Sequence, residues 1–180
     1  MNDPTKKLTF AGMFLALCLL LPFLTGNDIM LGNALSLMHI PVLLCGFVCG
    51  WQYGMTVGFI APLLRFLVFT KPPIYPIGTA MAFELAVYGL MAGLLYKYFP
   101  KKVPYIYVSL ILSMFGGRVV WGAARFVMAG LGNSEFSFEM FLYGAFVVAV
   151  PGIILHIVLI PLIVIAMKQA KLILNDSREQ

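Results

Sequence analysis

Hydrophobic residues dominate the chain in long runs, and short polar segments separate one run from the next. Apolar runs of roughly 18 or more residues are typical of transmembrane helices, and such runs recur along this chain of 180 residues. The pattern predicts an all-α integral membrane protein in which residues 1–180 form a single bundle of six transmembrane helices. We expect these helices over residues 8–24, 38–50, 53–70, 77–96, 104–129 and 139–167.

Glycine and proline mark the expected breaks between helices. Residues 39–70 exceed the length of one span by about half, so the chain must turn within them, and Gly50 followed by the polar Gln52 is the best position. The prolines within residues 71–76 force a loop before the next helix. Glycine recurs at every fourth position across the first of these turns, at Gly46, Gly50, Gly54 and Gly58. This spacing indicates that the two helices joined by the turn pack closely together.

The distribution of charge predicts the orientation of the bundle. Only 11% of the residues are charged, whereas soluble domains carry about 25%. The basic residues gather at one end of the predicted bundle: Lys6, Lys7, Lys97, Lys101, Lys102, Lys168, Lys171 and Arg178. Only Lys71 falls in a segment at the other end. Because cytoplasmic segments carry an excess of Lys and Arg, this asymmetry predicts cytoplasmic N and C termini, and it explains the net positive charge without a nucleic-acid partner.

The chain lacks the sequence motifs of the common enzymatic and metal sites. It contains no P-loop, no Gly-rich nucleotide loop, no zinc-protease helix motif and no recognisable Ser/His/Asp set. Cys18, Cys45 and Cys49 lie inside apolar segments, where cysteine behaves as a small hydrophobic residue. We therefore expect no cofactor, no metal ion and no covalent catalysis by this chain.

Ionisable residues inside the predicted helices are the candidate functional residues, because a charge in lipid is costly and by default marks a site. These residues are His39, Arg65, Glu84, Arg118, Arg125 and His156. At about 1.5 Å of rise per residue, all of them except His156 fall in the outer half of the membrane. Three arginines against one glutamate leave an excess of positive charge there, which favours an anionic ligand group such as a carboxylate.

Residue spacing adds aromatic side chains to this predicted pocket. Arg118, Trp121 and Arg125 share one helix face, so two guanidinium groups would flank an indole ring and form an anion clamp with a stacking surface. Glu84 and Tyr88 likewise share one face of the preceding helix. The predicted substrate-binding residues are His39, Arg65, Glu84, Tyr88, Arg118, Trp121 and Arg125 of the helices, with Tyr75 and Asn133 of the outer loops.

Structural roles stay open for several of these side chains. Arg65 and Glu84 could form an ion pair between neighbouring helices, and Arg125 could extend to the outer interface. His39 could cap the start of its helix. His156 has no acidic neighbour in sequence, so we interpret it as a packed core histidine.

Short segments spread over nearly the whole chain carry a family resemblance: Leu37-Met38-His39-Ile40-Pro41-Val42, Gly54-x-x-x-Gly58-Phe59-x-x-Pro62-Leu63, Pro72-Pro73, Ala80-Met81-Ala82-Phe83-Glu84-Leu85, Gly117-Arg118-x-x-Trp121-Gly122 and Ala149-x-Pro151-Gly152. Together they resemble the substrate-binding (S) components of energy-coupling-factor (ECF) transporters. Members of that family meet a coupling subunit through an Ala-x-x-x-Ala motif on their first helix. The matching position here reads Gly12-x-x-x-Ala16, which keeps the helix surface small but departs from the motif.

The resemblance implies a subunit that binds a vitamin or related micronutrient at the outer side of a bacterial cytoplasmic membrane. The implied partners are a transmembrane coupling subunit and two ATPase subunits, and the implied delivery step is a toppling of the subunit within the bilayer. Pantothenate would suit the arginines. A pyridine or pyrimidine vitamin, such as pyridoxine or hydroxymethylpyrimidine, would suit Glu84, Tyr88 and Trp121, and folate and niacin also stay open.

Two other classes of protein fit parts of the sequence pattern. An integral-membrane enzyme that modifies lipids could use His39, Glu84 and His156 as acid–base groups, but such enzymes usually carry an acidic metal-binding motif that is absent here. A non-transporting assembly subunit would instead hold charged residues that pair only with one another.

Overall fold

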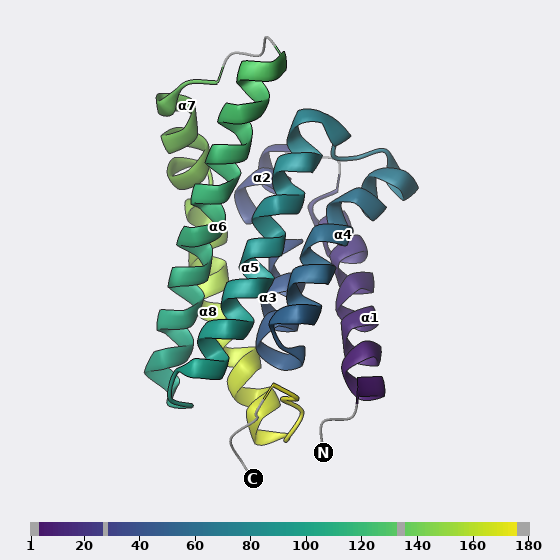
Figure 1. Cartoon of the computed structure of the whole chain (residues 1–180), viewed down its shortest axis with the longest axis vertical. Helices are drawn as coiled ribbons and strands as arrows, with labels where there is room; N and C mark the ends of the chain where they lie inside the picture. Colours follow the sequence, from purple (N-terminus) through teal and green to yellow (C-terminus); the bar gives the residue numbers. More distant parts are fainter. Residues whose placement is uncertain (1–3, 27–28, 133–135, 176–180) are drawn as a thin grey trace.

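The computed structural model describes residues 4–26, 29–132 and 136–175, and this part of the chain is helical throughout, without a strand. The elements, in chain order, are α1 (Pro4–Leu20), η1 (Leu21–Thr25), α2 (Ile29–Leu35), α3 (His39–Cys49), α4 (Trp51–Phe69), η2 (Ile74–Gly78), α5 (Thr79–Tyr98), α6 (Val103–Gly132), α7 (Phe138–Leu142), η3 (Tyr143–Val147) and α8 (Val150–Gln169). Most of the long helices run along the long axis of the molecule (Figure 1).

Five helical segments among the described residues are long and apolar enough to cross a membrane: Pro4–Thr25, Trp51–Phe69, Ile74–Tyr98, Val103–Leu131 and Val150–Gln169. The protein is therefore an all-helical, multi-pass membrane protein. The 11 residues of α3 extend over about 16 Å at 1.5 Å per residue, roughly half of the hydrocarbon core of a bilayer. A bundle of six full spans consequently stays a prediction.

The short helix α3 forms the centre of the molecule. Every one of its residues is buried, and α1, α4, α5 and α8 all pack against it. Phe47, Leu43 and Val48 are fully enclosed side chains of this helix. Because α3 is apolar on all sides, other helices can cover it completely, which is the behaviour expected of a helix without a polar face.

The turn between α3 and α4 lies at Gly50, as the sequence predicts. Gly50 has a φ of 100°, a left-handed conformation that glycine adopts without the steric penalty of a Cβ atom. It is the single residue between the end of α3 at Cys49 and the start of α4 at Trp51. The chain therefore reverses direction in very little space and brings α4 alongside α3.

Glycines then hold α3, α4 and α5 in backbone contact. A Cβ atom on Gly89 would lie 2.1 Å from the carbonyl oxygen of Gly54, and one on Gly46 would lie 2.5 Å from the carbonyl oxygen of Gly89. A Cβ atom on Gly58 would lie 2.2 Å from the carbonyl oxygen of Leu85. Small residues allow this approach between helices in lipid, and we call Gly46, Gly54, Gly58 and Gly89 the glycine junction.

The described chain begins and ends at the same end of the molecule, where α1 starts and the segment after α8 finishes (Figure 1). The turns that join α4 to α5 and α6 to α7 lie at the opposite end (Figure 1). Lysines of the segment that joins α5 to α6 and of the end of α8 therefore share the end of the termini, whereas Lys71 lies at the other end. Which side of the membrane each end faces stays a prediction.

Two segments differ from the elements expected from sequence. Residues 25–37, expected as a loop, contain α2. The last predicted helix, 139–167, is divided into α7, η3 and α8, with the break just before Pro151. Proline fits the first turn of a helix, where its missing N–H is not needed, so Pro151 begins α8 rather than interrupting a longer helix.

Candidate functional site

The carboxylate of Glu84 is the centre of a buried group of polar side chains between α3, α5, α6 and α8. Glu84 is 1% exposed, and its Oε1 atom lies 3.1 Å from an Nη atom of Arg118. The hydroxyl of Tyr88 donates a hydrogen bond of 3.1 Å to the same oxygen, and Nε2 of His39 lies 3.5 Å from it. With His156, which stacks on His39, these residues form what we call the polar cluster.

Helix geometry explains how Glu84 obtains two of these partners. Tyr88 follows Glu84 by one turn of α5, and residues four apart in a helix are neighbours. Arg118 reaches across from α6, where Gly117 removes the obstacle, because a Cβ atom at that position would lie 1.9 Å from the ring of Tyr88. The tyrosine ring therefore lies close to the backbone of α6 at Gly117, and the next residue of this helix, Arg118, reaches the carboxylate.

His39 is the first residue of α3, and the backbone of Ser36 orients its ring. Its Nδ1 atom lies 3.0 Å from the carbonyl oxygen of Ser36, and since a carbonyl only accepts, Nδ1 must carry the proton. Ser36 has a φ of 47°, which turns the chain between α2 and α3. This turn directs Nε2 of His39 towards Glu84, where a second proton would make the imidazole a cation facing the carboxylate.

His156 of α8 completes the polar cluster. Its ring stacks on that of His39 with a centroid separation of 6.1 Å and an interplanar angle of 24°. The residue is 2% exposed, and its Nε2 atom has no hydrogen-bond partner among the described residues. Buried polar atoms are nearly always paired, so this nitrogen marks the place where a further polar group would be accommodated.

The charges of the polar cluster largely compensate one another. Glu84 and Arg118 form a close ion pair in which the side chains are 1% and 13% exposed. Burial of such a pair is tolerated because each charge has its partner and further hydrogen bonds. Arg118 is the more accessible member of this pair.

Arg65 and Glu84, for which an ion pair was one alternative, have different partners in the structure. A guanidinium N–H of Arg65 donates to the carbonyl oxygen of Leu19 at 2.7 Å, and its Cζ atom lies 5.2 Å from the ring centre of Phe23 and 5.5 Å from that of Phe69. Arg65 therefore joins α4 to the end of α1. The excess of arginines predicted for one pocket does not gather at Glu84.

Trp121 and Arg125 lie on α6 beside a group of phenylalanines. The indole of Trp121 packs edge-on to Phe136 at 5.8 Å and stacks on Phe141 at 6.2 Å. The guanidinium of Arg125 lies 4.9 Å from the ring centre of Phe136. The two arginines of α6 thus contact different partners, Glu84 and Phe136, instead of flanking Trp121 around one anion.

The loop residues predicted for the site have different outcomes. The hydroxyl of Tyr75 donates to the carbonyl oxygen of Met128 at 2.9 Å, so it joins η2 to the outer part of α6. Asn133 lies outside the described residues. A role of either residue in substrate binding stays a prediction.

The small residues predicted to contact a coupling subunit lie on an open face of α1. Gly12 and Ala16 are both exposed, and a Cβ atom on Gly12 would meet nothing within 4 Å.

Among the described residues, no group of three or more His, Cys, Asp or Glu side chains could hold a metal ion. The cysteines are free thiols buried between apolar neighbours.

Three contributions to the site were not anticipated from sequence. His156 belongs to the polar cluster rather than to an apolar core, Ser36 orients His39, and Phe136 packs on Trp121. The spacing of Gly152 and His156 could have indicated the first, because a Cβ atom on Gly152 would lie 2.5 Å from the carbonyl oxygen of Ala34. The small residue lets α8 approach α2, one turn from the histidine.

The helical bundle and its buried polar cluster define a multi-pass membrane protein with a polar site closed off from lipid. A family model described as the ECF transporter, substrate-specific component, matches residues 6–164. The chain therefore belongs to this family, and the resemblance inferred from its sequence is confirmed. No curated protein and no solved structure matches the chain.

Membership of the family defines the general role of the chain. It is a substrate-specific subunit of an ECF transporter, and such components are transporter subunits rather than enzymes. The family also implies a small-molecule substrate and coupling with a transmembrane subunit and ATPase subunits.

Proposed function

We propose that this subunit captures a small water-soluble vitamin or vitamin precursor at its polar cluster and delivers it to an ATPase-driven coupling module. The observation that carries the proposal is the enclosed carboxylate of Glu84, which is 1% exposed and has Arg118, Tyr88 and His39 around one oxygen. Ionisable groups at this depth in a membrane protein are functional sites by default. A ligand bound there would be shielded from lipid by the surrounding helices.

The unpartnered nitrogen of His156 argues for ligand binding over a purely structural network. An assembly subunit would gain most from charges and polar atoms that satisfy one another completely, because a half-satisfied network is costly. Here Nε2 of His156 has no hydrogen-bond partner within the described part of the chain. A polar ligand that donates or accepts at this nitrogen would remove that cost.

The chemistry of the polar cluster favours a pyridine or pyrimidine compound, such as pyridoxine or hydroxymethylpyrimidine. Glu84 accepts hydrogen bonds, Arg118 donates them, and an imidazole can do either. The rings of His39 and Tyr88, 5.2 Å apart, offer planar surfaces to an aromatic ligand. Pantothenate fits less well, because its carboxylate would have to compete with Glu84 for Arg118.

Coupling would use the open small-residue face of α1. Gly12 and Ala16 are exposed there, and small residues permit close helix contact in lipid. We place the transmembrane coupling subunit on this face, with cytoplasmic ATPases supplying the energy and toppling of the subunit as the delivery step. The expected location is a bacterial cytoplasmic membrane.

A binding screen on the purified subunit tests the proposal. Thermal unfolding and tryptophan fluorescence would be followed with pyridoxine, hydroxymethylpyrimidine, niacin, pantothenate and folate. A ligand at 100 times its Kd stabilises the folded state by about 2.7 kcal/mol, which gives a clear shift in Tm. We expect a ring compound without a carboxylate to give the largest shift.

Matched lysine substitutions locate the site. Arg118→Lys keeps the charge but loses the planar fork that holds a carboxylate, so we expect weaker binding of the ring compound. Arg65→Lys makes the same exchange at the contact of α4 with the end of α1 and should leave the affinity unchanged. An increase in Tm with pantothenate alone would show that the ligand is a carboxylate compound and not a pyridine or pyrimidine. No increase in Tm with any compound would contradict the proposal.

A further inference from the structure

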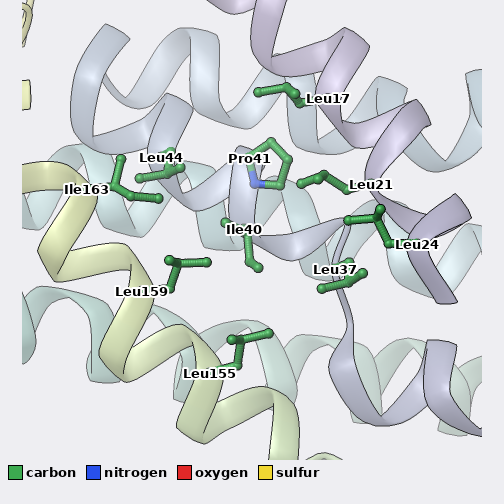
Figure 2. A pocket seen from close by; sticks show the side chains of 10 residues that line it. All are labelled: Leu17, Leu21, Leu24, Leu37, Ile40, Pro41, Leu44, Leu155, Leu159 and Ile163. Carbon is green, nitrogen blue, oxygen red and sulfur yellow. The ribbon is translucent and has the colours of Figure 1, made fainter.

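An apolar cleft lies between α1, α3 and α8, on the side of α3 that faces away from Glu84. Its volume is about 360 Å³, and all its lining residues are Leu, Ile or Pro. Figure 2 shows side chains from the three helices converging on it, among them Leu17, Leu24, Ile40, Leu44, Leu155 and Ile163. We propose that this cleft is a binding site for one acyl chain of a membrane phospholipid.

The lining of the cleft excludes polar occupants. A water molecule in a cavity needs two to four polar partners, and no polar side chain lines this one. A water-soluble vitamin would likewise lose its hydrogen bonds to water without replacement, which is unfavourable. A hydrocarbon chain has no such requirement, and its methylene groups gain dispersion contacts with aliphatic walls.

The shape and position of the cleft fit a lipid chain. Its lining extends from Leu17 on α1 to Leu24 on η1 and from Leu155 to Ile163 on α8, which is roughly 10–12 Å along the helix axes at 1.5 Å per residue. The long axis of the cleft therefore follows the membrane-crossing helices and the direction of acyl chains. Leu24, at one end, is 77% exposed, so a chain can enter from the surrounding bilayer.

Specific contacts hold the cleft open. The guanidinium of Arg65 donates to the carbonyl oxygen of Leu19, and Phe23 packs edge-on against Phe69 at 4.9 Å. These contacts fasten the end of α1 to α4. On the other side of α3, α8 buries His156 and Ile160, so α1 and α8 approach α3 from different sides and leave the cleft between them.

Photolabelling from a lipid chain tests this inference, independently of vitamin binding. The full chain would be reconstituted in phosphatidylcholine vesicles that contain a phosphatidylcholine with a diazirine in one acyl chain, and labelled residues would be located by mass spectrometry. Ile40 and Leu44 are only 4% and 5% exposed, but both line the cleft, so an acyl chain would contact them from inside the cleft and not from the outer surface of the bundle. We expect both to be labelled, together with Leu159.

Two variants of α8 supply the control. Leu159→Trp fills the cleft and should lower labelling of Ile40 and Leu44 several-fold. Leu162 is 64% exposed, so Leu162→Trp should leave this labelling unchanged. Thermal unfolding of each variant would verify that it is folded. Absence of label on Ile40 and Leu44 in the wild type would overturn the proposal, and labelling by a diazirine fatty acid but not by the phospholipid would overturn the choice of phospholipid.

Discussion

The two sides of α3 carry regions of opposite chemistry, the polar cluster and the apolar cleft. Nε2 of His39 lies 3.5 Å from the carboxylate of Glu84, whereas the next residue, Ile40, lines the apolar cleft. The same alternation recurs on α8, where His156 belongs to the polar cluster and Leu155 to the cleft. Adjacent residues on two helices therefore separate the buried polar cluster from the apolar cleft.

The difference between the regions teaches where a membrane protein can hold charge. The polar cluster is enclosed by four helices that supply every carboxylate, guanidinium and imidazole with protein neighbours. The cleft lies between α1, α3 and α8 and is lined by aliphatic side chains and one proline, with the exposed Leu24 at its open end. In lipid, the cost of an unpaired polar group makes this segregation necessary.

Removal of the central carboxylate is expected to have the largest effect. Glu84→Ala leaves Arg118 as a buried charge without its partner, and breaking a buried pair in this way costs about 3–5 kcal/mol. Thermal unfolding in detergent would measure the loss. Glu139→Ala, an exposed glutamate of α7, serves as the control, and an equal loss in both variants would show that the polar cluster is not special.

The glycine junction holds α5, which carries Glu84, against α3 and α4. A substitution there should cause the second-largest loss of stability. Gly89→Ala places a Cβ atom 2.1 Å from the carbonyl oxygen of Gly54, so α4 and α5 must separate, and overpacking of this kind costs about 1–3 kcal/mol. A lower Tm and a lower yield of folded protein are the expected readouts. Gly12→Ala, with no atom within 4 Å of the added Cβ, should behave as the wild type.

Arg65 fastens α4 to the end of α1, which borders the apolar cleft, so its substitution should affect the cleft and not the polar cluster. Arg65→Gln removes a hydrogen bond to Leu19 and two aromatic contacts, together worth about 1–2 kcal/mol. We expect a modest fall in Tm, reduced lipid labelling of Ile40, and no change in vitamin affinity. A fall in vitamin affinity comparable with that of Arg118→Lys would return Arg65 to the substrate site.

The smallest effect is expected at the contact between η2 and α6. Tyr75→Phe removes the hydrogen bond to the carbonyl oxygen of Met128, and because Tyr75 is 51% exposed the stability loss should stay below about 1 kcal/mol. Faster ligand dissociation, measured by stopped-flow fluorescence, is the expected functional result. An unchanged dissociation rate would exclude a role of Tyr75 in retaining the ligand.

Much of this architecture could be predicted from apolar runs, glycine and proline. The turn at Gly50 and the close packing of α3 and α4 followed from chain length and from glycine spacing. The helix α2 did not, because its few residues lie between polar positions that resemble a loop. The break in the last predicted helix, at residues 148–149, lies beside Pro151 and Gly152, where the sequence indicates an interruption, but Pro151 begins a helix there instead of ending one.

The members of the polar cluster were predictable where helical spacing decides them, as for Glu84 and Tyr88. Partners from different helices depend on rotation about the helix axis, which sequence spacing within one helix does not determine. For that reason Arg65 was placed in one predicted pocket with Glu84, whereas its guanidinium contacts the end of α1 in the structure. His156 is buried, as interpreted from the sequence, but its stacking on His39 could not be predicted because the two histidines are distant in sequence.

The central claim is that Glu84 and Arg118 bind the vitamin in addition to stabilising the fold, and calorimetric titration of the best ring compound tests it most directly. The double variant Glu84→Gln/Arg118→Gln removes both charges together, and replacing a buried ion pair by neutral groups is often nearly neutral for stability. We predict a folded double variant that no longer binds the compound. A folded double variant that binds with wild-type affinity would contradict the account.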